Sequence, residues 1–115
     1  MPRDVPNDFV KYRSMWLFTM FDLPTDTKEA RRRYTRFRKH LLNGGFMMIQ
    51  YSVYAQYCES EEVSNSRKKY VRAQMPLDGN VRMLAVTDRQ FGKMENYIGK
   101  MVIPSEDSPE QMLLF

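Results

Sequence analysis

The sequence predicts a single α+β domain in which two helices pack on one face of an antiparallel sheet. Two observations lead to this prediction. Apolar segments with the two-residue period of a strand alternate along the chain with two segments that have the period of an amphipathic helix. The length of 115 residues is enough for one compact core and too short for two.

The composition is that of a soluble globular domain, with 43% hydrophobic and 28% charged residues. No apolar run approaches the roughly 20 residues that span a bilayer, and the N-terminal segment lacks the apolar stretch of a signal peptide. The single cysteine, Cys58, excludes an intrachain disulfide and fits a reducing cytoplasm. Because His40 is the single histidine, the usual zinc sites are excluded. We therefore expect a cytoplasmic protein without a membrane segment.

The first strand is predicted from Trp16 to Leu23, after a polar, proline-containing N-terminal extension (1–14) that we expect to be flexible. Alternation places Trp16, Phe18 and Met20 on one face of this strand and Leu17, Thr19 and Phe21 on the other. Asp22 falls in phase with the large apolar residues of the first face. A charge at that position indicates that the strand ends there.

The first helix follows directly. Pro24 ends the strand, and Asp26 with Glu29 three residues later resembles a capping box, so we expect Asp26 to be the N-cap. Gly44 and Gly45 end the helix, as C-terminal glycines do. The apolar stripe of the helix is formed by Ala30, Tyr34, Phe37 and Leu41.

The rest of the chain supplies further strands and a second helix. Residues 46–58 read as one long strand, or two short ones joined at a bend near Tyr51–Ser52. Residues 61–75 form a second helix that ends at Pro76, residues 81–87 another strand, and residues 88–97 a short third helix. This order matches a ferredoxin-like βαββαβ sandwich over residues 15–104.

The open face of such a sheet needs cover, and a second copy of the chain is the simplest source. The segment 105–115 reads as an acidic linker followed by the apolar pentapeptide QMLLF. We expect this pentapeptide to be a last strand that adds to the sheet of a partner subunit. It also resembles short peptides that dock on bacterial sliding clamps, which is the alternative interpretation.

Positive charge is concentrated in the first helix. The net charge of the chain is +4, yet residues 27–44 hold seven basic residues against one acid. Most of these basic residues lie opposite the apolar stripe, where arginine forks can grip phosphate oxygens and release counterions. The pattern favours contact with a nucleic-acid backbone over a merely solvated helix. The candidate contact residues are Lys28, Arg31, Arg32, Arg36 and Lys39.

Asp22 has two interpretations. A carboxylate at a strand end near a dimer axis could bind Mg²⁺ with its symmetry mate, because Mg²⁺ prefers oxygen ligands and keeps several waters. Alternatively, Asp22 starts the turn with Leu23 and Pro24 by accepting backbone N–H bonds. No neighbouring DxD, ExK or HxH cluster is present, so a nuclease site would have to be assembled across two subunits.

Other polar residues are weaker candidates. His40 lies near the end of the first helix, where it is better explained as a partner of the helix dipole than as a catalytic base. Tyr51, Tyr54 and Tyr57 are interpreted as sheet packing, with an RNA-stacking platform as the alternative.

At this point the sequence resembles the Cas2 proteins of CRISPR adaptation, particularly those of type II systems. The resemblance lies in three segments and the basic helix that follows the first of them. The segments are MFDLPTDT (20–27), GGFMMIQYSVYAQ (44–56) and GNVRMLAVTDRQFGKM (79–94). They occur in the family's order and span most of the chain.

The resemblance implies a homodimer of ferredoxin-like subunits in which a C-terminal strand completes the partner's sheet. It implies a prokaryotic protein that bridges dimers of the Cas1 integrase, binds prespacer duplex DNA and meets other type II adaptation proteins. The family is also classed as Mg²⁺-dependent endoribonucleases or deoxyribonucleases. The family's catalytic, metal-binding aspartate corresponds to Asp22. The basic residues that contact duplex phosphates in the family correspond to the Lys28–Arg32 region.

Three functions are therefore carried forward. The leading hypothesis is a CRISPR adaptation subunit with an architectural role in spacer acquisition. The second is a nuclease that works through paired Asp22 carboxylates. The third is a stand-alone, toxin-like metal-dependent ribonuclease of the same fold.

Overall fold

The computed structural model describes residues 13–107 of the chain. Most of the predicted N-terminal extension and the QMLLF segment lie outside these residues. The predicted division into 1–14, 15–104 and 105–115 therefore stays a prediction. Within the described part of the chain, no helix is long and apolar enough to cross a membrane.

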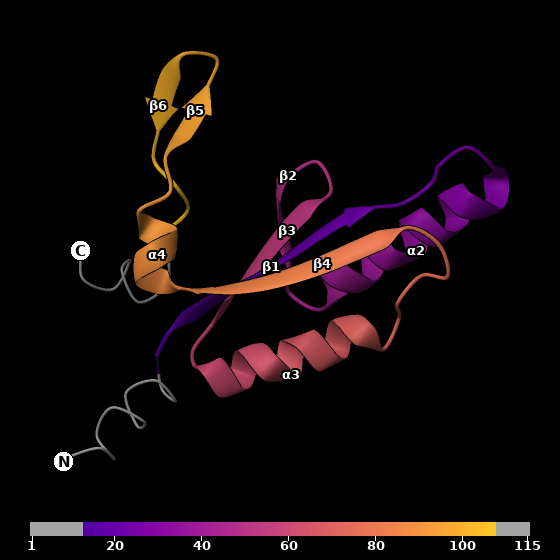
Figure 1. Ribbon diagram of the computed structural model, residues 1–115, viewed down its shortest axis with the longest axis horizontal. Helices are drawn as coiled ribbons and strands as arrows, with labels where there is room; N and C mark the ends of the chain where they lie inside the picture. Colours follow the sequence, from indigo (N-terminus) through magenta and orange to yellow (C-terminus); the bar gives the residue numbers. More distant parts are fainter. Residues whose placement is uncertain (1–12, 108–115) are drawn as a thin grey trace.

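The main sheet has four antiparallel strands in the spatial order β2-β3-β1-β4 (Figure 1). Its α+β architecture confirms the predicted class, and the order strand, helix, strand, strand, helix, strand is consistent with a ferredoxin-like fold. Residues 46–58 form two short strands, not one long strand. The elements are β1 (Met15–Asp22), α2 (Lys28–Asn43), β2 (Met47–Gln50), β3 (Val53–Cys58), α3 (Glu61–Arg72) and β4 (Asn80–Thr87).

Helix α2 begins one residue later than the sequence predicts, so the prediction that Asp26 is the N-cap was wrong. The N-cap is Thr27, whose extended backbone lets its hydroxyl accept a hydrogen bond from the Ala30 N–H at 3.0 Å. The end of the helix is as predicted: Gly44 is the C-cap, and Gly45 follows with a φ of +94°.

One face of the sheet is covered by both long helices. Leu17 and Tyr54 from the sheet pack with Phe37 of α2 and Val71 of α3, and all four side chains are at most 1% exposed. Helix α3 ends at Arg72, three residues before the predicted end.

The two helices are also bound to each other near their C-terminal ends. The ring of His40 stacks on Tyr70 with centroids 4.0 Å apart, and His40 Nε2 donates to the Tyr70 carbonyl at 2.6 Å. The Tyr70 hydroxyl donates to the His40 carbonyl at 2.8 Å. His40 therefore joins α2 to α3 in addition to lying in the last turn of α2.

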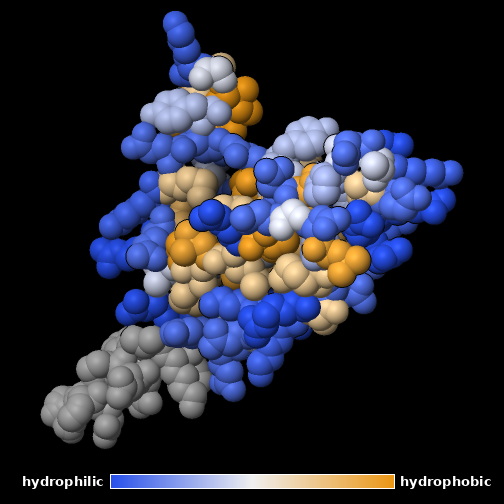
Figure 2. All heavy atoms as spheres, turned by 45° about the vertical axis from the view of Figure 1, so that its right-hand side comes forward, coloured by the Kyte–Doolittle hydropathy of each residue, from blue (hydrophilic) through white to orange (hydrophobic). Residues whose placement is uncertain are grey.

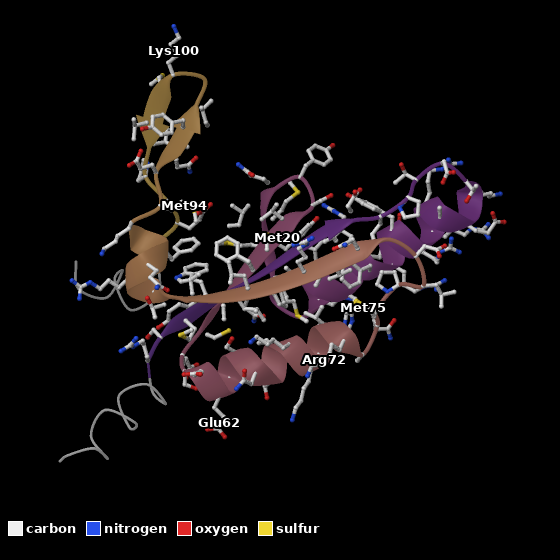
Figure 3. All side chains as sticks on the ribbon, in the orientation of Figure 1. Met20, Glu62, Arg72, Met75, Met94 and Lys100 are labelled. Carbon is white, nitrogen blue, oxygen red and sulfur yellow. The ribbon has the colours of Figure 1, made fainter. Side chains whose placement is uncertain are left out.

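Among residues 13–107, the opposite face of the sheet is covered at one end only. There, Phe91 of helix α4 (Asp88–Gly92) stacks on Trp16 with centroids 4.0 Å apart, and Trp16 Nε1 donates to the Asp88 carboxylate at 2.8 Å. Elsewhere on this open face Leu84 is 54% exposed. Figure 3 shows Met20 on the side of the sheet opposite to α3, whose Glu62 and Arg72 point away from the sheet.

A hairpin that was not predicted from the sequence follows α4. Strands β5 (Asn96–Ile98) and β6 (Met101–Ile103) pair with each other and stand away from the main sheet (Figure 1). The predicted third helix is correspondingly shorter than 88–97. Figure 2 shows hydrophobic residues on this hairpin, at the top, and across the middle of the molecule below it. The exposed apolar side chains of the hairpin are Tyr97, Ile98, Met101 and Val102.

Candidate nucleic-acid interface

The outer side of α2 presents a continuous basic surface. Because the apolar stripe of the helix is held against the sheet by Phe37 and Leu41, the residues on the opposite side are turned to solvent. All five predicted contact residues are exposed. Together with Thr35, they line one shallow hollow along the helix; they are Lys28, Arg31, Arg32, Arg36 and Lys39. We call this surface the basic face.

The basic face has little internal charge compensation. Within residues 13–107 the one ion pair joins Arg33, on the flank of the helix, to Asp78 at 3.1 Å. Lys28, Arg32 and Arg36 follow one another at intervals of four residues, where like charges destabilise a helix by about 0.2–0.5 kcal/mol per pair. An anionic partner would remove this repulsion.

Asp22 lies at the last position of β1 and is exposed. It pairs in register with Asn80 of β4, at the end of the sheet where the β2–β3 turn also lies. Asp22, Tyr51, Ser52 and Arg82 line a hollow of about 400 Å³ whose remaining residues are Met20, Phe21, Val53 and Asn80. We call it the Asp22 hollow. It lies on the opposite side of the sheet from the basic face.

The Asp22 hollow contains the type of ligand atom that Mg²⁺ prefers. Asp22, Ser52 and Asn80 offer carboxylate, hydroxyl and amide oxygens, the hard ligands that Mg²⁺ prefers. Within the described residues, however, no group of three or more His, Cys, Asp or Glu side chains comes together. One subunit therefore contributes a single carboxylate to this place.

The three tyrosines interpreted as sheet packing differ in how far they are buried. Tyr54 is buried and Tyr57 packs edge-to-face on Trp16, so the packing interpretation is confirmed for both. It was wrong for Tyr51, which lies in the β2–β3 turn and is 87% exposed. Arg82 was not predicted as a site residue, because its proximity to Asp22 depends on the pairing of two strands that are distant in sequence.

Fold and site together define a class: small α+β proteins with two helices on one sheet face, a basic first helix and an aspartate at the end of the first strand. Residues 15–94 match the family model described as CRISPR associated protein Cas2. The chain belongs to the Cas2 family.

Similar proteins cover nearly the whole chain. A protein of Parvibaculum lavamentivorans named CRISPR-associated endoribonuclease Cas2 is 50% identical over 101 residues, which are 88% of this chain and 100% of that protein. A protein of the same name from Flavobacterium psychrophilum is 39% identical over 105 residues, or 91% of each chain. One from Ligilactobacillus salivarius is 37% identical over 100 residues, 87% of this chain and 99% of that protein.

Proposed function

We propose that this protein is a CRISPR adaptation subunit that binds the backbone of prespacer duplex DNA through the basic face and bridges the Cas1 integrase as a homodimer. The observation that carries the proposal is the basic face itself. Five exposed cationic side chains on one side of one helix, without an ion pair among the described residues, suit a polyanion better than a protein partner. Membership of the Cas2 family supports the CRISPR role.

The basic face suits binding to the DNA backbone, because contacts between its side chains and phosphates do not depend on the base sequence. Arginine forks bind phosphate oxygens in pairs, and each neutralised phosphate releases counterions. If all five residues engage phosphates, the logarithm of affinity falls with the logarithm of salt with a slope of about −4 to −5.

The open face of the sheet supports the dimer. Leu84 and Met47 are 54% and 37% exposed there, and the hairpin strands leave their own edges unpaired with the main sheet. A second copy would cover the apolar surface, and a hairpin strand could extend the partner's sheet. The β5–β6 hairpin could fill that role because it has strand conformation. The predicted last strand, QMLLF, lies outside the described residues.

A metal-dependent endoribonuclease is the second candidate, favoured by the name of the similar proteins and by the position of Asp22. Asp22 from each subunit would hold Mg²⁺, which when bound supplies positive charge beside the reacting phosphate. The toxin-like ribonuclease of the same fold would use the same aspartate. The match to the Cas2 family favours a role in CRISPR over a role as a toxin.

One experiment separates the architectural role from the nuclease. The variant Asp22→Ala is expected to support normal spacer acquisition in cells that supply Cas1, while any metal-dependent RNA cleavage is lost. Asp26→Ala, in the neighbouring turn, is the matched control and should leave both unchanged. Loss of acquisition in Asp22→Ala, with dimerisation and duplex binding intact, would contradict the architectural proposal.

A second experiment tests the basic face. The triple variant Lys28→Glu, Arg32→Glu, Arg36→Glu should bind duplex DNA roughly 100-fold or more weakly at moderate salt. The control is Lys68→Glu, Lys69→Glu, Arg72→Glu on α3, which changes the net charge equally. Equal losses in both variants would show that net charge, not the basic face, governs binding.

A further inference from the structure

We infer that Lys28 is a modification site, at which its amine is acylated by a small acyl phosphate that the neighbouring arginines bind. This reaction does not depend on the proposed function. Its consequence, weaker binding of duplex DNA, does rest on that function, because Lys28 belongs to the basic face.

Lys28 differs from the other described lysines in its arginine neighbours. Within residues 13–107 it is the one lysine whose neighbours on the same helix face, three and four residues away, are both arginines. These neighbours are Arg31 and Arg32, whose Cβ atoms lie roughly 5–6 Å from that of Lys28. All three side chains line the same hollow. A ligand held by the two arginines therefore lies within reach of the Lys28 amine.

The two arginines are available to a phosphate group. Both are exposed, and neither has an ion pair among the described residues. Arg31 Nη1 donates to the Thr25 carbonyl at 3.1 Å, which holds the guanidinium beside the start of α2 and leaves the rest of its N–H fork for a ligand. The hollow has a volume of about 500 Å³, within the range of small-ligand pockets. Arginine forks bind phosphate oxygens in pairs, so a small phosphate ester or anhydride suits this place.

The acyl transfer needs no other reactant. The neutral Lys28 Nζ attacks the acyl carbon, a C–N bond forms, and the C–O bond to the phosphate breaks. The electron pair leaves with the phosphate, the amine proton passes to solvent, and nothing is oxidised or reduced. Arg31 and Arg32 position the reagent and stabilise the charge that grows on the departing phosphate.

Acylation changes the basic face because an amide carries no positive charge. One of its five cations is then lost, and with it one phosphate contact and its released counterion. Bound duplex would cover the Lys28 amine, so the modification is expected on the free protein.

The test is mass spectrometry of the full chain after incubation with acetyl phosphate. Lys28 should be acetylated about 10-fold faster than Lys100, because hydrogen bonds from arginine to the charged phosphate favour the reagent at Lys28. Lys100 is exposed at the tip of the β5–β6 hairpin, which contains no arginine and stands away from α2 (Figure 3). Acetic anhydride has no phosphate for an arginine to bind, so it should modify both lysines at similar rates.

Arginine variants test whether phosphate binding causes the preference. The double variant Arg31→Gln, Arg32→Gln should lower the rate at Lys28 with acetyl phosphate to that at Lys100, and leave the rate with acetic anhydride unchanged. Arg72→Gln, at an exposed position on α3, is the control and should react as wild type. Inorganic phosphate should compete with acetyl phosphate at Lys28 only.

Three results would overturn the inference. They are equal rates at Lys28 and Lys100 with acetyl phosphate, a preference for Lys28 that persists with acetic anhydride, and a preference that survives in the double arginine variant. The first would show that no reagent is bound, and the other two that exposure, not phosphate binding, governs the reaction.

A separate measurement addresses the consequence for DNA. Lys28→Gln, which imitates the acetylated side chain, should reduce the salt slope of duplex binding by about 1, whereas Lys28→Arg should retain it. Unchanged duplex binding by Lys28→Gln, with acetylation still selective for Lys28, would refute the proposed DNA contact of this residue and leave the modification site established.

Discussion

On the helix-covered face of the sheet Leu17 and Tyr54 are fully buried, whereas on the opposite face Leu84 is 54% exposed and Tyr51 is 87% exposed. The first face is closed by two helices that are hydrogen-bonded to each other through His40 and Tyr70. Within the described part of the chain, the second face is covered by one short helix, α4, at one end. The first face therefore carries most of the buried core of the subunit, whereas the second leaves apolar side chains exposed.

The charges are divided in the same way. The basic face belongs to the outer layer over the closed side of the sheet, whereas the Asp22 hollow lies on the open side. The basic face and the Asp22 hollow are therefore separated by the thickness of the sheet.

The largest expected effect concerns the closed face. Phe37→Ala should lower the free energy of unfolding by about 3–5 kcal/mol, because Phe37 is 1% exposed and packs edge-to-face on Phe21. Urea unfolding followed by circular dichroism measures it. A loss below about 1 kcal/mol would mean that the closed face does not carry the stability.

A smaller effect on unfolding, but a large one on assembly, is expected on the open face. Leu84→Asp should cost the isolated subunit about 1 kcal/mol or less, since the side chain is 54% exposed. The same variant should dissociate the proposed dimer in sedimentation at micromolar concentration. A dimer of unchanged stability would place the subunit contact elsewhere.

At the N-cap of α2, the variants Thr27→Ala and Asp26→Ala should differ in free energy of unfolding by about 1 kcal/mol. Thr27→Ala should lower stability by that amount, because the Ala30 N–H loses its acceptor. Asp26→Ala should change stability by only a few tenths of a kcal/mol, since Asp26 precedes the cap. Equal losses of stability in both variants would contradict the assignment of Thr27 as the N-cap in place of Asp26.

The smallest effect is a pH dependence from Cys58. Burial raises the pKa of the Cys58 thiol from 9.0 to about 11, and nearby Arg67 opposes part of this rise. Because the folded state keeps the proton that the unfolded chain releases, stability from this thiol is complete below pH 9 and falls as pH rises toward 11. The loss at pH 9.5 is on the order of 1 kcal/mol or less. Cys58→Ala should show a shallower fall in stability between pH 8 and 9.5, and an equal slope would contradict this origin.

The sequence was sufficient for the main elements and for the basic face, because both depend on the periodicity of single segments. The stripe that includes Phe37 and Leu41 determines which side of α2 meets the sheet, and so which side carries the arginines. The Cas2 resemblance rested on local segments in the right order, and the family match confirmed it.

Features that depend on short segments or on distant pairings were not predicted. The three-residue strands β5 and β6 are too short for an alternating pattern, and their turn depends on Gly99 at a φ of +62°. The approach of Arg82 and Tyr51 to Asp22 follows from the register of paired strands, which no single segment reveals. The helix cap shifted by one residue because both Asp26 and Thr27 are good caps in sequence.

Lysine footprinting with an amine-reactive reagent tests the central claim most directly. In the presence of a DNA duplex, Lys28 and Lys39 on the basic face should be protected from modification, whereas Lys69 on α3 and Lys93 after α4 should react as in the free protein. All four side chains are exposed before DNA is added. Protection of Lys69 or Lys93 with Lys28 and Lys39 still reactive would contradict the assignment of duplex binding to the basic face of α2.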